Sequence, residues 1–166
     1  MSPDSTDISR LALPGLFGIA AEAVLIEFRQ ELVDAGYGDV RPTHGCVFRF
    51  VREDGMRLTE LASLAGMTKQ SIGEVVDDLA ALGYVKRVPD PADRRAKLIC
   101  LTGKGEQAQR VAYRLFGAIE RRWAERYGAD RVAALRELLE EIATTEVPDL
   151  VPELSRAAHE ADLARA

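Results

Sequence analysis

The chain has 166 residues, 47% of them hydrophobic and 30% charged, which excludes a disordered polyelectrolyte and provides enough apolar residues for a core. Two cysteines, Cys46 and Cys100, are too few and too unpatterned for a disulfide framework or a structural zinc site. The net charge of −5 is opposite to that of a general nucleic-acid binder, so the distribution of charge matters more than its sum.

Basic residues are concentrated in one part of the chain. Residues 57–104 contain eight Lys or Arg against six Asp or Glu. Within them, residues 84–104 contain six Lys or Arg against only Asp90 and Asp93, a local charge of +4. This asymmetry predicts a local anion-binding surface on an acidic molecule.

The N-terminal segment has no basic leader, and Asp4 and Asp7 argue against a signal peptide. The apolar stretch from Leu11 to Ile26 contains Pro14 and Glu22 and is too short to span a bilayer. We therefore expect a soluble, cytoplasmic protein with no membrane partner.

The first predicted helix covers residues 16–33 and is apolar almost all the way round from Ile19 to Phe28, so it needs cover on more than one side. Thr43 is the predicted N-cap of a short helix that ends near Val51. Residues 52–58 form a turn that leads into a few extended residues.

A pair of helices is predicted next. Residues 59–66 form a short helix with Thr59 as its cap and Gly66 as its end. Thr68 then caps a second helix that Gly83 ends. This helix has one buried face, because its apolar residues follow at i, i+3, i+4 and i+7: Ile72, Val75, Val76 and Leu79.

Residues 84–88 and 97–102 read as two strands of a hairpin with a long loop, and Thr102 caps a helix that runs to about Tyr127. Residues 129–144 form another helix, followed by a charged, alanine-rich tail whose composition allows a last one. Two short helices across a tight turn with a hairpin behind them predict a winged helix-turn-helix, mainly α with a small β-hairpin wing. We expect it at residues 41–104, between dimerisation helices at 1–40 and 105–166.

Two segments of the sequence carry a resemblance to a known family. The stretch "DPADRRAKLICLT" (90–102) follows the wing pattern of the MarR family of regulators, with an aspartate, one residue, an arginine, a short strand and a closing Leu-Thr. The stretch "LTELASLAGMTKQSIGEVVDDLAALGYVKR" (58–87) resembles the helix-turn-helix that precedes this wing. The resemblance implies a DNA-binding transcriptional regulator, a homodimer and a repressor that a small aromatic or phenolic effector releases.

The start of the 68–83 helix has the residue types that a recognition helix presents to the major groove. Gln70 is suited to adenine, and Lys69 to guanine or a phosphate. Thr68 and Ser71 are suited to phosphates or to either base. Gly73 costs about 1 kcal/mol relative to alanine in a helix interior and lies off the buried face, so close approach of a groove wall would explain it, a tolerated glycine being the alternative.

Acidic residues on the same helix oppose this interpretation. Glu74, Asp77 and Asp78 lie on or beside its exposed face. We expect them to pair with nearby arginines and to weaken non-specific DNA binding; one of them could instead accept a hydrogen bond from cytosine.

The predicted hairpin loop holds Asp93, Arg94, Arg95 and Lys97. An arginine at such a tip can enter a narrow minor groove, where the potential is most negative. By its position in the motif, Arg95 matches the family's wing arginine and Asp93 the acid that braces it, while Arg94 is expected to bind a phosphate. The alternative is an ordinary solvated charged loop.

Further apolar stripes in residues 111–142 require mutual burial, which favours a homodimer on a pseudo-palindromic duplex. By analogy, an effector would bind between the dimer helices and the DNA-binding part, and the residues that could line its pocket are Phe17, Phe28, His44, Phe48 and Arg49.

Other classes of function have little support in the sequence. Cys46 and Cys100 raise the possibility of a redox sensor, but Cys46 lies among apolar residues, as expected for a small buried hydrophobe. No catalytic constellation, metal site or cofactor motif is present, so we expect no enzyme and no cofactor. A winged helix used for protein interaction without DNA is the alternative, and the acids of the recognition helix favour it.

Overall fold

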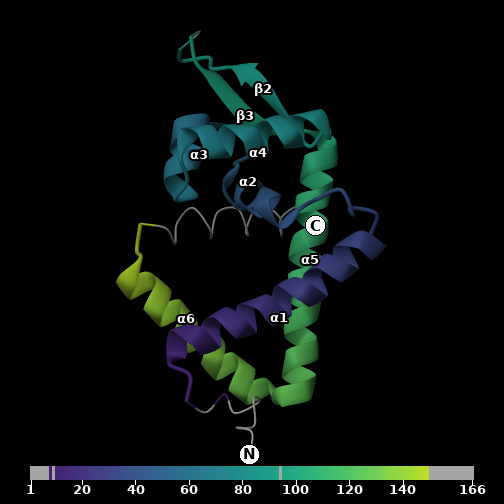
Figure 1. The fold of residues 1–166 in the computed structure, drawn as a ribbon, viewed down its shortest axis with the longest axis vertical. Helices are drawn as coiled ribbons and strands as arrows, with labels where there is room; N and C mark the ends of the chain where they lie inside the picture. The colour runs from purple at the N-terminus through teal and green to yellow at the C-terminus, as the bar shows by residue number, and fades with distance from the viewer. Residues whose placement is uncertain (1–7, 9, 94, 150–166) are drawn as a thin grey trace, which may run out of the picture.

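A winged helix-turn-helix forms one end of the molecule (Figure 1). The computed structural model describes residues 8, 10–93 and 95–149. In chain order this lobe consists of η1 (Pro42–His44), α2 (Gly45–Phe50), β1 (Met56–Arg57), α3 (Leu58–Leu64), α4 (Lys69–Ala81), β2 (Val85–Pro89) and β3 (Lys97–Leu101). The strands form an antiparallel sheet in the order β1-β3-β2, in which Val85 faces Leu101 and Pro89 faces Lys97. The predicted fold class is confirmed.

Three longer helices lie outside this lobe: α1 (Leu13–Asp34), α5 (Gly103–Tyr127) and α6 (Ala129–Glu146). Figure 1 shows α5 running from the lobe to the opposite end of the molecule, with α1 crossing it and α6 turning back. The reversal between α5 and α6 occurs at Gly128, whose φ of +99° favours glycine. Both α1 and α6 pack against α5.

Local signals fix the helix boundaries of the lobe. Thr68 Oγ1 accepts the Ser71 N–H at 3.1 Å at the start of α4, and Thr102 Oγ1 accepts the Gly105 N–H at 3.1 Å at the start of α5. Gly83, with φ +80°, follows the end of α4. These caps and the glycine end are confirmed as the sequence predicts.

Two predicted caps are wrong. Thr43 lies inside η1, which begins at Pro42 because the fixed φ of proline suits a first helical position. Thr59 lies inside α3, which begins one residue earlier and has no side-chain cap. The first helix also begins earlier than predicted, at Leu13, because Pro14 is tolerated in a first turn that needs no backbone donor there.

The core of the lobe is built around the predicted face of α4. Ile72, Val76 and Leu79 are fully buried, and Val75 is partly buried against them. They pack with buried residues of the other lobe elements: Val47, Phe50, Val51, Met56, Leu61, Tyr84, Val85, Ile99 and Leu101.

The apolar faces of α1 and α6 are largely uncovered in the single chain. Leu32 is the buried residue of α1, whereas Leu13, Ile19 and Ile26 are each more than half exposed. No described residue of α6 is buried, and Leu138 is 52% exposed. No helix of the described chain is long and apolar enough to cross a membrane.

Candidate nucleic-acid interface

The start of α4 presents its polar side chains to solvent. Thr68, Lys69 and Gln70 are exposed, and Ser71 is half-buried. The hydroxyls of Thr68 and Ser71 lie 2.8 Å apart, so the cap is closed by two side chains. A helix N-terminus with free donors and these hydroxyls is suited to phosphate as well as to base edges.

Gly73 is half-buried on the side of α4 that faces α3. A Cβ built there would lie 3.9 Å from Leu58 Cδ2, an ordinary van der Waals distance. Packing within the chain therefore does not require a glycine at this position.

The acids of α4 have partners. Asp77 pairs with Arg87 of β2, and Asp78 with Arg41, which lies outside the helix. Glu74 accepts a hydrogen bond from Gln70 Nε2 at 3.3 Å. Arg41 and Arg87 thus offset two of the three acidic charges, as the expected pairing with arginines requires.

Asp78 also joins α4 to a buried histidine. The His44 side chain is 1% exposed, and its Nδ1 accepts the backbone N–H of Arg41 at 3.1 Å. The proton of the neutral ring is therefore on Nε2, which donates to Asp78 at 2.6 Å. Burial, followed by the charge of Arg41, lowers the pKa of His44.

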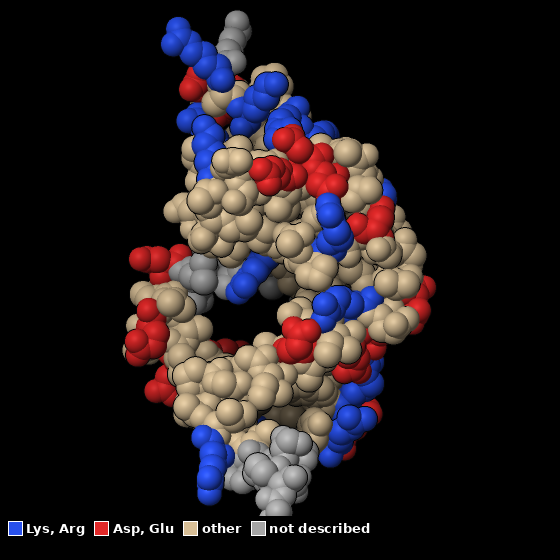
Figure 2. Space-filling model, in the orientation of Figure 1, with Lys and Arg blue, Asp and Glu red and all other residues tan. Residues whose placement is uncertain are grey.

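The wing is the loop between β2 and β3. Figure 2 shows Lys and Arg side chains gathered at this end of the molecule. Asp93, Arg95 and Lys97 are all exposed, and Arg94 lies outside the described residues. Asp93 Oδ1 accepts the backbone N–H of Arg95 at 3.0 Å, so it shapes the turn and does not bind the guanidinium in the described structure.

A further carboxylate stands at the base of the wing. Asp90 is 6% exposed and accepts two N–H groups of Arg57. No local pattern in the sequence marks Arg57, because it lies 33 positions from Asp90 and only the fold brings the two together.

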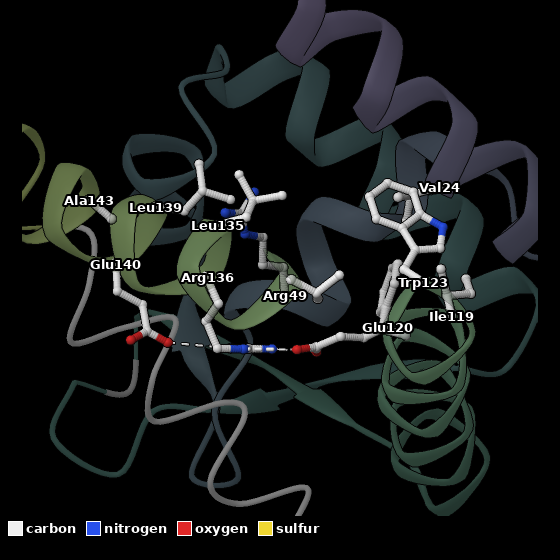
Figure 3. A pocket seen from close by; sticks show the side chains of 12 residues that line it. Val24, Arg49, Ile119, Glu120, Trp123, Leu135, Arg136, Leu139, Glu140 and Ala143 are labelled. Carbon is white, nitrogen blue, oxygen red and sulfur yellow. Dashed lines mark hydrogen bonds and ion pairs between the residues drawn. The ribbon is translucent and has the colours of Figure 1, made fainter. Parts of the chain in front are cut away.

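An open cavity of about 640 Å³ lies between α1, α2, α5 and α6 (Figure 3). Most of its lining is apolar, and Trp123 forms part of it. Arg136 reaches Glu120 Oε1 at 2.8 Å and Glu140 Oε1 at 3.3 Å. Arg49 comes from α2, and in the described structure it has no acidic partner, its guanidinium lying 5.4 Å from the Phe50 ring.

The structure does not bring the five predicted pocket residues into one site. Arg49 lines the cavity, and Phe28 stacks at 4.2 Å on Phe116, which lines it. Phe48 belongs to the lobe core, His44 faces Asp78, and Phe17 is 45% exposed on α1. The other residues that line the cavity come chiefly from α5 and α6. Their apolar spacing in the sequence predicted a dimer interface and not a pocket.

Neither cysteine has a lowered thiol pKa. Burial raises the pKa of both the Cys46 and the Cys100 thiol. Cys46 packs against the lobe core and donates to the Thr43 carbonyl at 3.1 Å. Among the described residues, no group of His, Cys, Asp and Glu is placed to hold a metal ion.

Comparison with known proteins agrees with the geometry. A model of the MarR family matches residues 39–96. No curated protein matches the chain. The transcriptional regulator PA4135 is 29% identical with a TM-score of 0.64, and the alignment covers 82% of this chain and 98% of that one. A MarR-family transcriptional regulator from Rhodococcus sp. RHA1 is 28% identical with a TM-score of 0.62, over 80% of this chain and 95% of that one.

CouR from Rhodococcus jostii RHA1 is a third similar protein. Its structure bound to p-coumaroyl-CoA is 28% identical, with a TM-score of 0.60, and covers 78% of this chain and 90% of that one. The repressor CouR bound to a 23-mer DNA duplex has a TM-score of 0.66 at 25% identity, over 86% of this chain and 99% of that one. The same motifs lie in the same order on the same fold, so the chain is similar to proteins of the MarR family, which are transcriptional regulators.

Proposed function

We propose that this protein is a homodimeric transcriptional repressor that binds a pseudo-palindromic DNA duplex. The observation that carries the proposal is the exposed polar start of α4 beside an exposed basic wing, on a lobe whose core leaves both free. Helix α4 enters the major groove, and the wing enters the adjacent minor groove.

Each residue of this surface has a proposed role. Gln70 reads adenine and Lys69 binds guanine or a phosphate, while Thr68 and Ser71 bind phosphate at the helix start. Arg95 enters the minor groove. Lys97 and Arg94 bind the backbone, Asp93 shapes the turn before Arg95, and Gly73 allows close approach of the groove wall.

The molecule divides into a DNA-binding part at 41–104 and dimerisation parts at 1–40 and 105–166. The exposed apolar faces of α1 and α6 support this division, because a second copy would cover them. A two-fold axis then places two α4 helices about one helical turn of DNA apart, roughly 34–36 Å, and requires a matching symmetry in the site.

Selection of bound fragments from genomic DNA, followed by fluorescence anisotropy on the selected duplex, tests the proposal. We expect Arg95→Ala to weaken binding about tenfold or more. The control is Arg131→Ala, because Arg131 is exposed just after the α5–α6 reversal, at the opposite end of the molecule from the wing (Figure 1). Equal affinity in parent and Arg95→Ala would reject the wing assignment.

A protein-interaction module without DNA is the competing function. Its main support was the acidic charge of α4, and ion pairs with Arg41 and Arg87 offset much of that charge. A salt titration with random duplex separates the two functions, because phosphate contacts make the affinity fall steeply as salt rises. Affinity that is absent, or independent of salt, would favour the interaction module.

The cavity between the lobe and the long helices is the proposed effector site. Arg49 supplies a cation without an acidic partner among the described residues, and Trp123 and Phe116 supply aromatic surface. CouR, a similar protein, is known bound to p-coumaroyl-CoA. We propose a small aromatic effector with a carboxylate or phenolate, which shifts the dimer away from its DNA-competent state.

The effector site has a built-in reporter, because Trp123 is the single tryptophan of the chain. Titration with cinnamate should change its fluorescence, and cinnamyl alcohol, which lacks the charge, should bind more weakly. In Arg49→Gln the preference for cinnamate over the alcohol should disappear. A preference that persists in Arg49→Gln would remove Arg49 from the site.

A further inference from the structure

Asp90 is a nearly buried carboxylate at the point where β2 ends and the wing begins. Its side chain is 7% exposed, whereas the charged residues nearer the tip of the wing, Asp93, Arg95 and Lys97, are exposed. Burial of a carboxylate costs free energy unless its oxygens accept hydrogen bonds.

The lone pairs of Asp90 are used on both sides. Oδ2 accepts Arg57 Nε–H at 2.8 Å and Nη2–H at 2.5 Å, and Oδ1 accepts the Ala92 N–H at 2.8 Å. The backbone of Asp90 closes the loop, because its N–H donates to the Ala96 carbonyl at 3.1 Å. The Ala92 N–H and then Arg57 hold the pKa of Asp90 below its ordinary value, so the carboxylate is charged at neutral pH.

Arg57 belongs to a different part of the lobe. It is a residue of β1, its backbone is paired with Leu98 of β3, and it directly precedes α3. The ion pair therefore joins the base of the wing to the start of the helix-turn-helix. A hairpin loop held only by its two strands would swing about them, whereas a side-chain bond to the sheet edge fixes its direction.

We propose that Arg57 and Asp90 are positioning residues, which hold the wing at the angle at which Arg95 reaches the minor groove. The inference rests on the proposed DNA binding. It adds two residues that support DNA binding without contacting a base themselves. Asp90 shapes the loop from inside, and Arg57 fixes the loop to the helices. Removal of Arg57 leaves the buried carboxylate without its cation, and the loop rearranges to hydrate it.

A double-mutant cycle on DNA affinity tests the inference with the full-length chain and its selected duplex. The proteins are the parent, Arg57→Ala, Arg95→Ala and the double variant. We expect Arg57→Ala to weaken DNA binding. On a logarithmic scale, its loss of affinity should be at least half of the loss caused by Arg95→Ala. The double variant should bind no more weakly than Arg95→Ala, because Arg57 acts only through the wing.

Conservative variants and a measurement without DNA complete the experiment. Arg57→Lys should recover only part of the affinity, because an ammonium lacks the planar pair of N–H groups that converge on Asp90 Oδ2, and Asp90→Asn should match Arg57→Ala. Amide hydrogen exchange of Asp93, Arg95 and Lys97 in the free protein should be faster in Arg57→Lys than in the parent, while exchange in α4 stays unchanged.

Two results overturn the inference while leaving the proposed function in place. Losses from Arg57→Ala and Arg95→Ala that multiply in the double variant would make Arg57 an independent DNA contact. Unchanged affinity and unchanged exchange in Arg57→Lys would make the pair a structural detail. If the parent itself binds no duplex, the proposed function falls first, and the inference falls with it.

Discussion

Substitution of Gly73 should affect folding stability and DNA binding in opposite directions. Its conformation is that of an ordinary helix, and an added Cβ meets Leu58 Cδ2 at 3.9 Å. Gly73→Ala should therefore raise the free energy of unfolding by up to about 1 kcal/mol, because alanine loses less backbone entropy. If α4 binds the major groove as proposed, the same change should weaken DNA binding, because the added methyl group would meet the groove wall. Urea unfolding and anisotropy measure the two effects on one protein.

The prediction for Gly73→Ala is specific, because stability should rise while DNA affinity falls. A variant that is more stable and binds DNA as well as the parent would show that the glycine is merely tolerated. Loss of both stability and binding would mean that α3 and α4 pack more closely than the distance to Leu58 indicates.

His44 makes the stability of the lobe sensitive to mild acid. Its folded pKa is below the ordinary value of 6.5, so above pH 6.5 the ring is neutral whether the chain is folded or not. Below pH 6.5 the unfolded chain takes up the proton first, and the free energy of unfolding falls until the pH passes the folded pKa. Protonation would also put a hydrogen on Nδ1, which accepts the Arg41 N–H.

Unfolding curves between pH 5 and pH 7.5 measure this effect. His44→Gln should be less stable at neutral pH and should lose the extra decline below pH 6.5, since glutamine has no proton to gain. His159 is present in both proteins, so the difference between their pH profiles isolates His44. Parallel profiles would show that His44 does not titrate in this range.

At the scale of the element, α4 and α5 both begin with a threonine N-cap, but their proposed roles differ. In each helix a threonine hydroxyl accepts an N–H three residues later at 3.1 Å. Thr68→Ala and Thr102→Ala should each lower the free energy of unfolding by about 1 kcal/mol. Only Thr68→Ala should also weaken DNA binding, because α4 and not α5 is the helix proposed to enter the groove. Equal affinities would place the start of α4 away from the DNA.

The same helix shows how an acidic element can approach an anionic partner. Asp77 forms an ion pair with Arg87, and Asp78 forms one with Arg41. Their negative charges are therefore offset within the molecule. Glu74 accepts a hydrogen bond from Gln70, a neutral donor. The charges of Asp77 and Asp78 are therefore offset by two arginines that lie outside α4.

At the scale of the whole molecule, the uncovered faces of α1 and α6 predict self-association. Leu138 is 52% exposed, so Leu138→Lys should leave the single chain folded while placing a charge in the proposed dimer interface. Sedimentation should show a monomer, and affinity for the two-fold duplex should fall by at least tenfold through loss of avidity. Leu138→Met, which keeps the apolar surface, is the control and should remain a dimer. A dimeric Leu138→Lys would place the interface elsewhere.

Local sequence determined much of the lobe, because each signal acts within a few residues. The apolar spacing of Ile72, Val76 and Leu79 is one helical face wherever the chain lies, and Thr68 caps that helix through its own backbone. The hairpin and its basic loop were equally local. Where the local signals were ambiguous, as at Thr43 and Thr59, neighbouring residues began the helix earlier.

Tertiary structure alone decided which distant side chains meet. His44 and Asp78 are 34 positions apart, and Arg57 and Asp90 are 33, so no periodicity relates them. The cavity likewise takes Arg49 from one helix and Trp123 from another. Elements follow from the conformational preferences of short segments, whereas these contacts depend on how whole elements pack, and packing is set by the combined shape of many side chains.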